Sequence, residues 1–128
     1  MGREMRRIRV QALKNQAVIA DKCHVAECFI DRLRGLIGRR LEPDGGLLLP
    51  KCSSIHMWFM KFPIDVVFVK VLNTDNDNVR YMVTSVHASV KPWKALPLSD
   101  WKATDTLELP EGTVARSALI AGDELCTS

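Results

Sequence analysis

Apolar and polar residues alternate in the first part of the chain, which is typical of a half-buried β-strand. Ile8, Val10 and Ala12 alternate with polar neighbours, and a short polar turn at 14–16 leads into an apolar run at 17–20. The pattern therefore predicts that the chain opens with a β-hairpin.

A helical spacing follows this hairpin. Phe29, Leu33 and Leu36 recur every three to four residues with charged side chains between them, and Gly38 stands where a helix commonly ends. The spacing predicts one main amphipathic helix over residues 26–37.

The rest of the chain consists of short apolar runs separated by polar or proline-containing turns. These runs predict β-strands at residues 47–49, 54–59, 64–71, 79–86, 106–109 and 124–126. The polar segment 73–78 predicts the tip of a long hairpin. Residues 91–102 have no clear period and predict a loop, and Pro110 precedes a short helical turn near 111–118.

These elements predict an α+β fold that is mostly β, built as a compact antiparallel-rich sheet or a small, partly closed barrel. The length of 128 residues suits a single domain over residues 1–128, and 47% hydrophobic residues are enough for one core. We expect the domain to be a monomer or a weak dimer.

The net charge of +3 is too small to indicate a nucleic-acid partner. Arg3, Arg6, Arg7 and Arg9 cluster at the start, and such a run is typical of a solvated strand end, the alternative being an arm that binds phosphates. We therefore expect no nucleic-acid partner.

The cellular location is predicted from the absence of apolar segments. No stretch approaches the roughly 20 apolar residues that cross a bilayer, and the first residues are charged where a signal peptide would be apolar. We expect a cytoplasmic protein that does not contact membranes. Cys23, Cys28, Cys52 and Cys126 are then expected to be reduced thiols.

Three separated motifs stand in one order along the chain: RLRGL from Arg32, SIHMWFMKFPIDVVFV from Ser54, and LELPEGTVARSALIAGDEL from Leu107. Together they resemble the domain of unknown function 192 family, over roughly residues 17–126. The resemblance implies a small β-rich domain with one main helix. It implies no particular activity, because none is established for that family.

The second motif holds the residues that point to chemistry. If residues 52–60 are extended, Cys52, Ser54, His56 and Met60 share one face of the strand. His56 can titrate near neutral pH, and Asp65 follows just beyond the corner at residue 63. We expect a pocket for a small polar ligand or a peptide, built from the following residues: Ser54, His56, Met60, Asp65, Trp93 and Arg34.

Other roles remain open for these residues. Asp65 could instead accept hydrogen bonds and only hold the corner, with Arg34 or Lys61 as a charged partner. Cys52 and His56 would lie about 13 Å apart on an extended strand, too far to share one metal ion unless the backbone bends. We therefore predict no cofactor and no metal, and keep this pair as the candidates for a soft-metal site.

Catalysis is the alternative to simple binding. Cys52 and His56 could form a thiol-dependent enzyme site if the thiolate were stabilised. The sequence contains no glycine-rich phosphate loop, no Gly-x-Ser-x-Gly elbow and no His-Glu-x-x-His motif. A binding module without turnover is therefore favoured over an enzyme.

Overall fold

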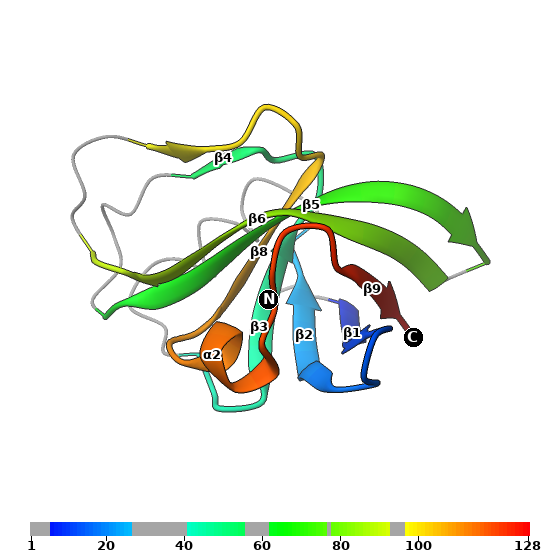
Figure 1. The fold of residues 1–128 in the computed structure, drawn as a ribbon, viewed down its shortest axis with the longest axis horizontal. Coiled ribbons are helices and arrows are strands. Elements are labelled where there is room, and N and C mark those ends of the chain that lie inside the picture. The colour runs from blue at the N-terminus through cyan, green and yellow to red at the C-terminus, as the bar shows by residue number, and fades with distance from the viewer. Residues whose placement is uncertain (1–5, 27–40, 56–61, 77, 93–96) are drawn as a thin grey trace, which may run out of the picture.

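The computed structural model describes residues 6–26, 41–55, 62–76, 78–92 and 97–128. The main element is a closed barrel (Figure 1) with the strand order β1 (Arg6–Ala12), β2 (Val18–Val25), β3 (Gly45–Leu49), β8 (Asp105–Pro110), β5 (Ile64–Asp75), β6 (Asn78–Val90) and β9 (Glu124–Thr127). A separate two-stranded sheet pairs β4 (Ser54–Ile55) with β7 (Leu98–Ser99). The helix α2 (Thr113–Ser117) lies at one end of the barrel.

All neighbouring strands of the barrel are antiparallel except β2 and β3, which are parallel. Closure leaves none of these seven strands with an unpaired edge. At Gly46 the packing between strands is tight, because a Cβ there would lie 3.2 Å from Leu109 Cδ2 and 3.3 Å from Ala20 Cβ. A larger residue at this position would therefore have to push its neighbours aside where β3 passes between β2 and β8.

Two apolar cores lie on opposite faces of the barrel wall. The first core fills the interior, because its members come from every barrel strand and include Val10, Leu48, Val67, Leu107 and Leu125. The second core, which lies on the outer face of β3, β8 and β5, includes the following residues: Leu47, Leu49, Ile64, Val66, Phe68 and Val90. Ile55 of β4 and Leu98 of β7 pack against it, so the small sheet covers part of this outer face.

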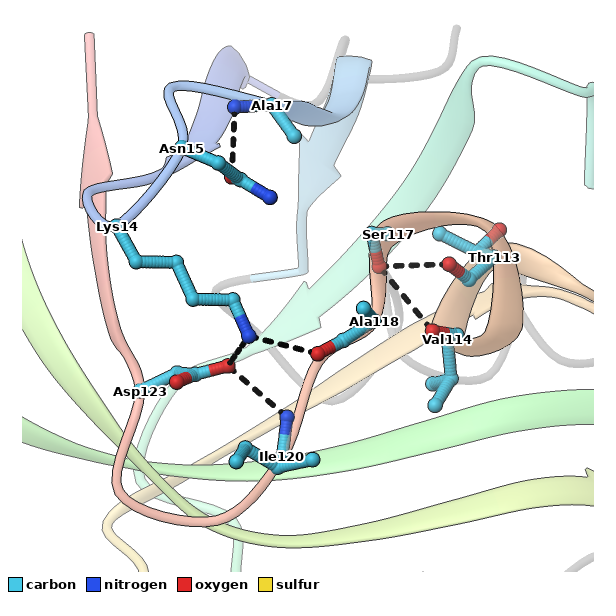
Figure 2. A network of polar contacts seen from close by, with 9 residues as sticks. All are labelled: Lys14, Asn15, Ala17, Thr113, Val114, Ser117, Ala118, Ile120 and Asp123. Atoms are coloured by element: carbon cyan, nitrogen blue, oxygen red, sulfur yellow. Dashed lines mark hydrogen bonds and ion pairs between the residues drawn. The ribbon is translucent and has the colours of Figure 1, made fainter.

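The α2 end of the barrel is joined to the turn between β1 and β2 by one lysine. Figure 2 shows Lys14 Nζ donating to the carbonyl of Ala118 at 2.7 Å and lying 2.7 Å from Asp123 Oδ2. The same carboxylate oxygen accepts the backbone N–H of Ile120 at 3.0 Å. The turn between β1 and β2 is thus held to the segment that follows α2, and Lys14 and Ala118 are 104 positions apart in the sequence.

The predicted mostly β fold is confirmed, and the choice between a sheet and a barrel is settled in favour of a closed barrel. The hairpin of β5 and β6 and the helical turn near 111–118 are present. The main helix predicted over 26–37 is not supported, since α2 is the only helix among the described residues. That range lies outside them, apart from Ala26, which is buried in the second core.

Two strands were incompletely predicted because their local patterns are interrupted. β2 continues past the predicted end at residue 20 to Val25, although Asp21 and Lys22 break the apolar alternation. β7 lies within the segment 91–102 that was predicted to be a loop. The added part of β2 pairs with β1 on one side and with β3 on the other, and β7 pairs with β4, so both need partners beyond their own local pattern.

Candidate functional site

Polar side chains gather on the second core face, in a row that crosses three strands. Val66 in the middle of β5 is paired with His87 of β6 on one side and with Glu108 of β8 on the other. Cross-strand partners share one face of a sheet, so His87 and Glu108 lie on the same outer face with Val66 between them. The Cα atoms of His87 and Glu108 are two strand spacings apart, which is about 10 Å.

Glu108 is the most unusual residue on this face. Its side chain is 1% exposed, between the apolar neighbours Val66 and Leu47. Oε2 is the one buried side-chain oxygen or nitrogen without a hydrogen-bond partner among the residues that the structure describes. Burial raises the pKa of this carboxyl to about 8, so most molecules hold it protonated at neutral pH.

A second polar group starts at His87 and runs along β6 to Asp100. His87 packs edge-on against Phe68, with ring centroids 5.6 Å apart, and its Nε2 lies 3.2 Å from Ser85 Oγ. Ser85 Oγ in turn donates to Asp100 Oδ2 at 2.7 Å. The imidazole, the hydroxyl and the carboxylate therefore form a chain of contacts on a half-exposed surface.

Asp100 is held as a carboxylate at the end of this chain. Burial acts to raise its pKa, but hydrogen bonds from the Thr84 and Ser85 hydroxyls and the Lys102 backbone, together with the Lys102 charge, lower the pKa below its ordinary value. The hydroxyl of Ser85 must then donate its proton to Asp100, so its oxygen accepts from His87 Nε2–H. Ser85 is consequently not arranged as a nucleophile that a histidine activates.

Asp65, a predicted site residue, lies on the other side of the barrel wall. Asp65 is fully buried and paired with Leu109 of the first core. Its Oδ1 accepts the backbone N–H of Ser89 at 2.9 Å, and its Oδ2 accepts that of Val114 at 2.8 Å. Both oxygens are thus used by the backbone of the same domain, and they point away from the face that carries Glu108.

Ser54 and Cys52 lie at the small outer sheet. Ser54 is exposed and its Oγ lies 2.7 Å from Ser99 Oγ, which joins β4 to β7. The Cys52 thiol donates to the carbonyl of Ser54 at 3.1 Å, and Cys52 packs against the second core. The structure therefore leaves Ser54 exposed and Asp65 fully buried, and does not bring them into one pocket.

The remaining predicted site residues lie outside the described part of the chain: Arg34, His56, Met60 and Trp93. The pairing of Cys52 with His56, for a metal or for catalysis, stays a prediction for the same reason. No group of three or more metal-ligating side chains occurs in the described ranges.

A further buried polar cluster lies among the first core residues. Burial and the negative charge of Asp105 raise the pKa of Tyr81, and the Tyr81 hydroxyl is hydrogen-bonded to Asp105. The charge of Arg6 acts to lower this pKa. Burial also raises the pKa of the Cys23 thiol to about 12. These groups are held in un-ionised forms by their surroundings, so Cys23 is a packing residue of the interior and not a reactive thiol.

Comparison with models of known protein families identifies the family of this chain. The model of DUF192, described as "Uncharacterized ACR", matches residues 10–127. The chain belongs to the DUF192 family. None of the curated proteins matches it significantly.

Two solved structures are similar to this DUF192 domain. The first is described as a "putative transcription regulator" from Sinorhizobium meliloti, with 22% identity, a TM-score of 0.76, and coverage of 98% of this chain and 96% of that one. The second is a protein of unknown function from Novosphingobium aromaticivorans, with 22% identity, a TM-score of 0.72, and coverage of 94% and 84%. At this identity the likeness shows the fold alone.

Within the described residues, no helix has the length and apolar character to cross a membrane.

The sequence contained a usable signal for one residue of this candidate site. Glu108 stands between Leu107 and Leu109 in a strand that is buried on both faces, and a carboxyl in such a place must be either paired or neutral. The contact of Ser85 with Asp100 had no such signal, because it joins β6 to the segment after β7.

Proposed function

We propose that this DUF192 domain is a binding module that holds a small polar ligand or a peptide end, without turnover, on the outer face of β5, β6 and β8. The observation that carries the proposal is the buried Glu108 carboxyl, whose Oε2 has no partner in the described part of the protein. The proposal places the ligand against the outside of the barrel, since the second core lies there.

The energetics of Glu108 favour a partner that is supplied by a ligand. A buried polar atom without a hydrogen bond costs about 1–3 kcal/mol, and native proteins keep few of them. A ligand with an N–H group could donate to Oε2 of Glu108. This hydrogen bond would remove the cost and add to the affinity of the ligand. We therefore assign an amine, guanidine or amide group to the part of the ligand that meets Glu108.

His87 supplies a second recognition group at the edge of the same face. Its ring is fixed by Phe68 and Ser85, and it is only half-buried, so a ligand can reach it. The proton of Ser85 is committed to Asp100, which leaves no activated nucleophile in this chain of contacts. Recognition without a chemical step agrees with this arrangement.

A thermal-shift screen tests the proposal. Alkylamines, guanidines, primary amides and free amino acids are added to the folded domain at pH 7, and at least one class should raise Tm. The shift should disappear in Glu108→Gln, whose neutral amide has nearly the same shape, and persist in Glu111→Gln, an exposed control. A screen without any shift, or a shift that survives in Glu108→Gln, would contradict the proposal.

A further inference from the structure

A surface groove of about 350 Å³ lies over β1 and β2, away from the Glu108 face. Its lining consists of Arg7, Ile8, Arg9, Asp21, Lys22 and Ser128. In the strand order, β1 lies across the barrel from β5 and β8, so this groove is separate from the proposed ligand site.

A β-bulge gathers the charged residues of the groove. Ile8 pairs with Cys23 and Val10 pairs with Ala20, so the single residue Arg9 stands opposite two residues of β2. Those two residues are Asp21 and Lys22, and their backbone N–H groups both donate to the carbonyl of Asp44 at 3.0 Å. A bulge redirects side chains, and here it brings Lys22 to the same groove as Arg9.

The side chains of the groove carry three positive charges and one negative charge. Arg9 Nε lies 3.4 Å from Asp21 Oδ1, and Lys22 Nζ lies 3.9 Å from Asp44 Oδ2, with about half of each side chain exposed. Arg7 is exposed and has no ion pair with any of the described residues. Exposed pairs of this kind contribute only about 0.2–1 kcal/mol, so Arg9 and Lys22 can turn from Asp21 and Asp44 toward an added anion at little cost.

We propose that this groove binds the phosphate group of a small phosphorylated molecule. Two guanidinium groups and one ammonium group in one groove suit the oxygens of a single phosphate, which arginine binds through paired N–H groups. The volume is at the lower end of the range for small-molecule sites. A nucleic-acid backbone would need basic residues along a longer path than three side chains provide.

An NMR titration tests this site with defined probes. Inorganic phosphate and ADP are added to the ¹⁵N-labelled domain, with sodium chloride at matched ionic strength as the control. Both phosphate probes should shift the amide signals of Arg7, Arg9 and Lys22, and chloride should not. Equal shifts with chloride, or none with either probe, would overturn the proposal.

Variants connect the shifts to the charges of the groove. The double variant Arg7→Gln/Arg9→Gln should weaken ADP binding at least tenfold, and Lys22→Gln alone about threefold. Arg80→Gln should leave ADP binding unchanged, since Arg80 is also exposed and ion-paired but belongs to β6. Unaltered affinity in both groove variants would overturn the proposal, as would tighter binding of duplex DNA than of ADP with a steep dependence on salt.

Discussion

Asp65 in β5 caps the helix that begins 48 positions later, because its Oδ2 accepts the backbone N–H of Val114 at 2.8 Å. The helix has no side-chain cap of its own at its N-terminus, since its N-cap residue is Gly112 with a φ of 96° and no side chain to accept a bond. The other oxygen of Asp65 accepts the N–H of Ser89, which has a positive φ of 53°. One carboxylate thus fixes two irregular backbone segments at one end of the barrel.

Replacing Asp65 should therefore destabilise the domain. Asp65→Asn keeps one accepting oxygen but turns the other position into a donor that faces a backbone N–H, so we expect a loss of about 2–3 kcal/mol in the free energy of unfolding. Urea unfolding measures it. Asp75→Asn at the exposed end of the same strand is the control and should change stability by less than about 0.5 kcal/mol. Equal stability of the two variants would contradict the capping role.

The pH dependence of stability should carry the signature of Glu108. Its folded pKa of about 8 lies above the ordinary value of 4.5, so the folded state binds one proton more than the unfolded state between these values. The contribution to stability is full below pH 4.5 and is lost as the pH rises to about 8.

Glu108→Gln isolates this contribution from other titrating groups. The difference in unfolding free energy between the wild type and the variant should change by up to about 1.4 kcal/mol per pH unit between pH 5 and 8. Urea titrations at four pH values measure the difference. A difference that does not vary with pH would show that Glu108 ionises normally in the folded protein.

The link between Lys14 and Asp123 should be measurable as a coupling energy. Burial acts to raise the pKa of Asp123, but the Lys14 hydrogen bond, the Ile120 N–H and the Lys14 charge lower this pKa below its ordinary value of 3.8. The contribution of Asp123 to the free energy of unfolding is therefore present above pH 3.8 and is lost as the pH falls through the lowered pKa. A double-mutant cycle with Lys14→Met and Asp123→Asn should give about 0.5–1 kcal/mol at pH 7, because Lys14 is partly exposed. The coupling should weaken as the pH falls below 3.8, and a coupling of zero at pH 7 would contradict the link.

Thiol labelling should distinguish Cys23 from the other described cysteines. Cys23 is fully buried, and burial raises the pKa of its thiol to about 12, whereas Cys52 and Cys126 are half-buried. In a Cys28→Ser variant, iodoacetamide at pH 8 should modify Cys23 only after unfolding, as mapped by peptide mass spectrometry. Labelling of Cys23 at the rate of Cys126 in the native protein would contradict its place in the interior.

The sequence predicted what depends on local periodicity. The alternation at Ile8 and Val10 and the long apolar run at 64–71 led to strands that the structure contains. Closure of the barrel was not predictable, because it depends on contacts between β1 and β9 at the two ends of the chain. A period of two gives each strand two faces but does not say which other strand each face will meet.

The same limit applies to the candidate site. Asp65 was identified as a buried carboxylate that needs partners, and its two partners, Ser89 and Val114, come from elements that no local pattern connects to it. Glu108 lies in an equally apolar strand, and its neighbours Leu107 and Leu109 offer no polar partner for its carboxyl. The groups that a side chain can meet depend on whether it faces the inside or the outside of the barrel. The register of the strands determines which side it faces.

The most direct test of the account is the titration of the Glu108 carboxyl itself, followed by ¹³C NMR of the side-chain Cδ and assigned with Glu108→Gln. The account predicts a midpoint near pH 8 in the free domain, and a change of that midpoint when a ligand with an N–H donor binds. A midpoint near 4.5 would mean that the carboxylate is already solvated or paired, and the proposed binding face would then lose the group on which it depends.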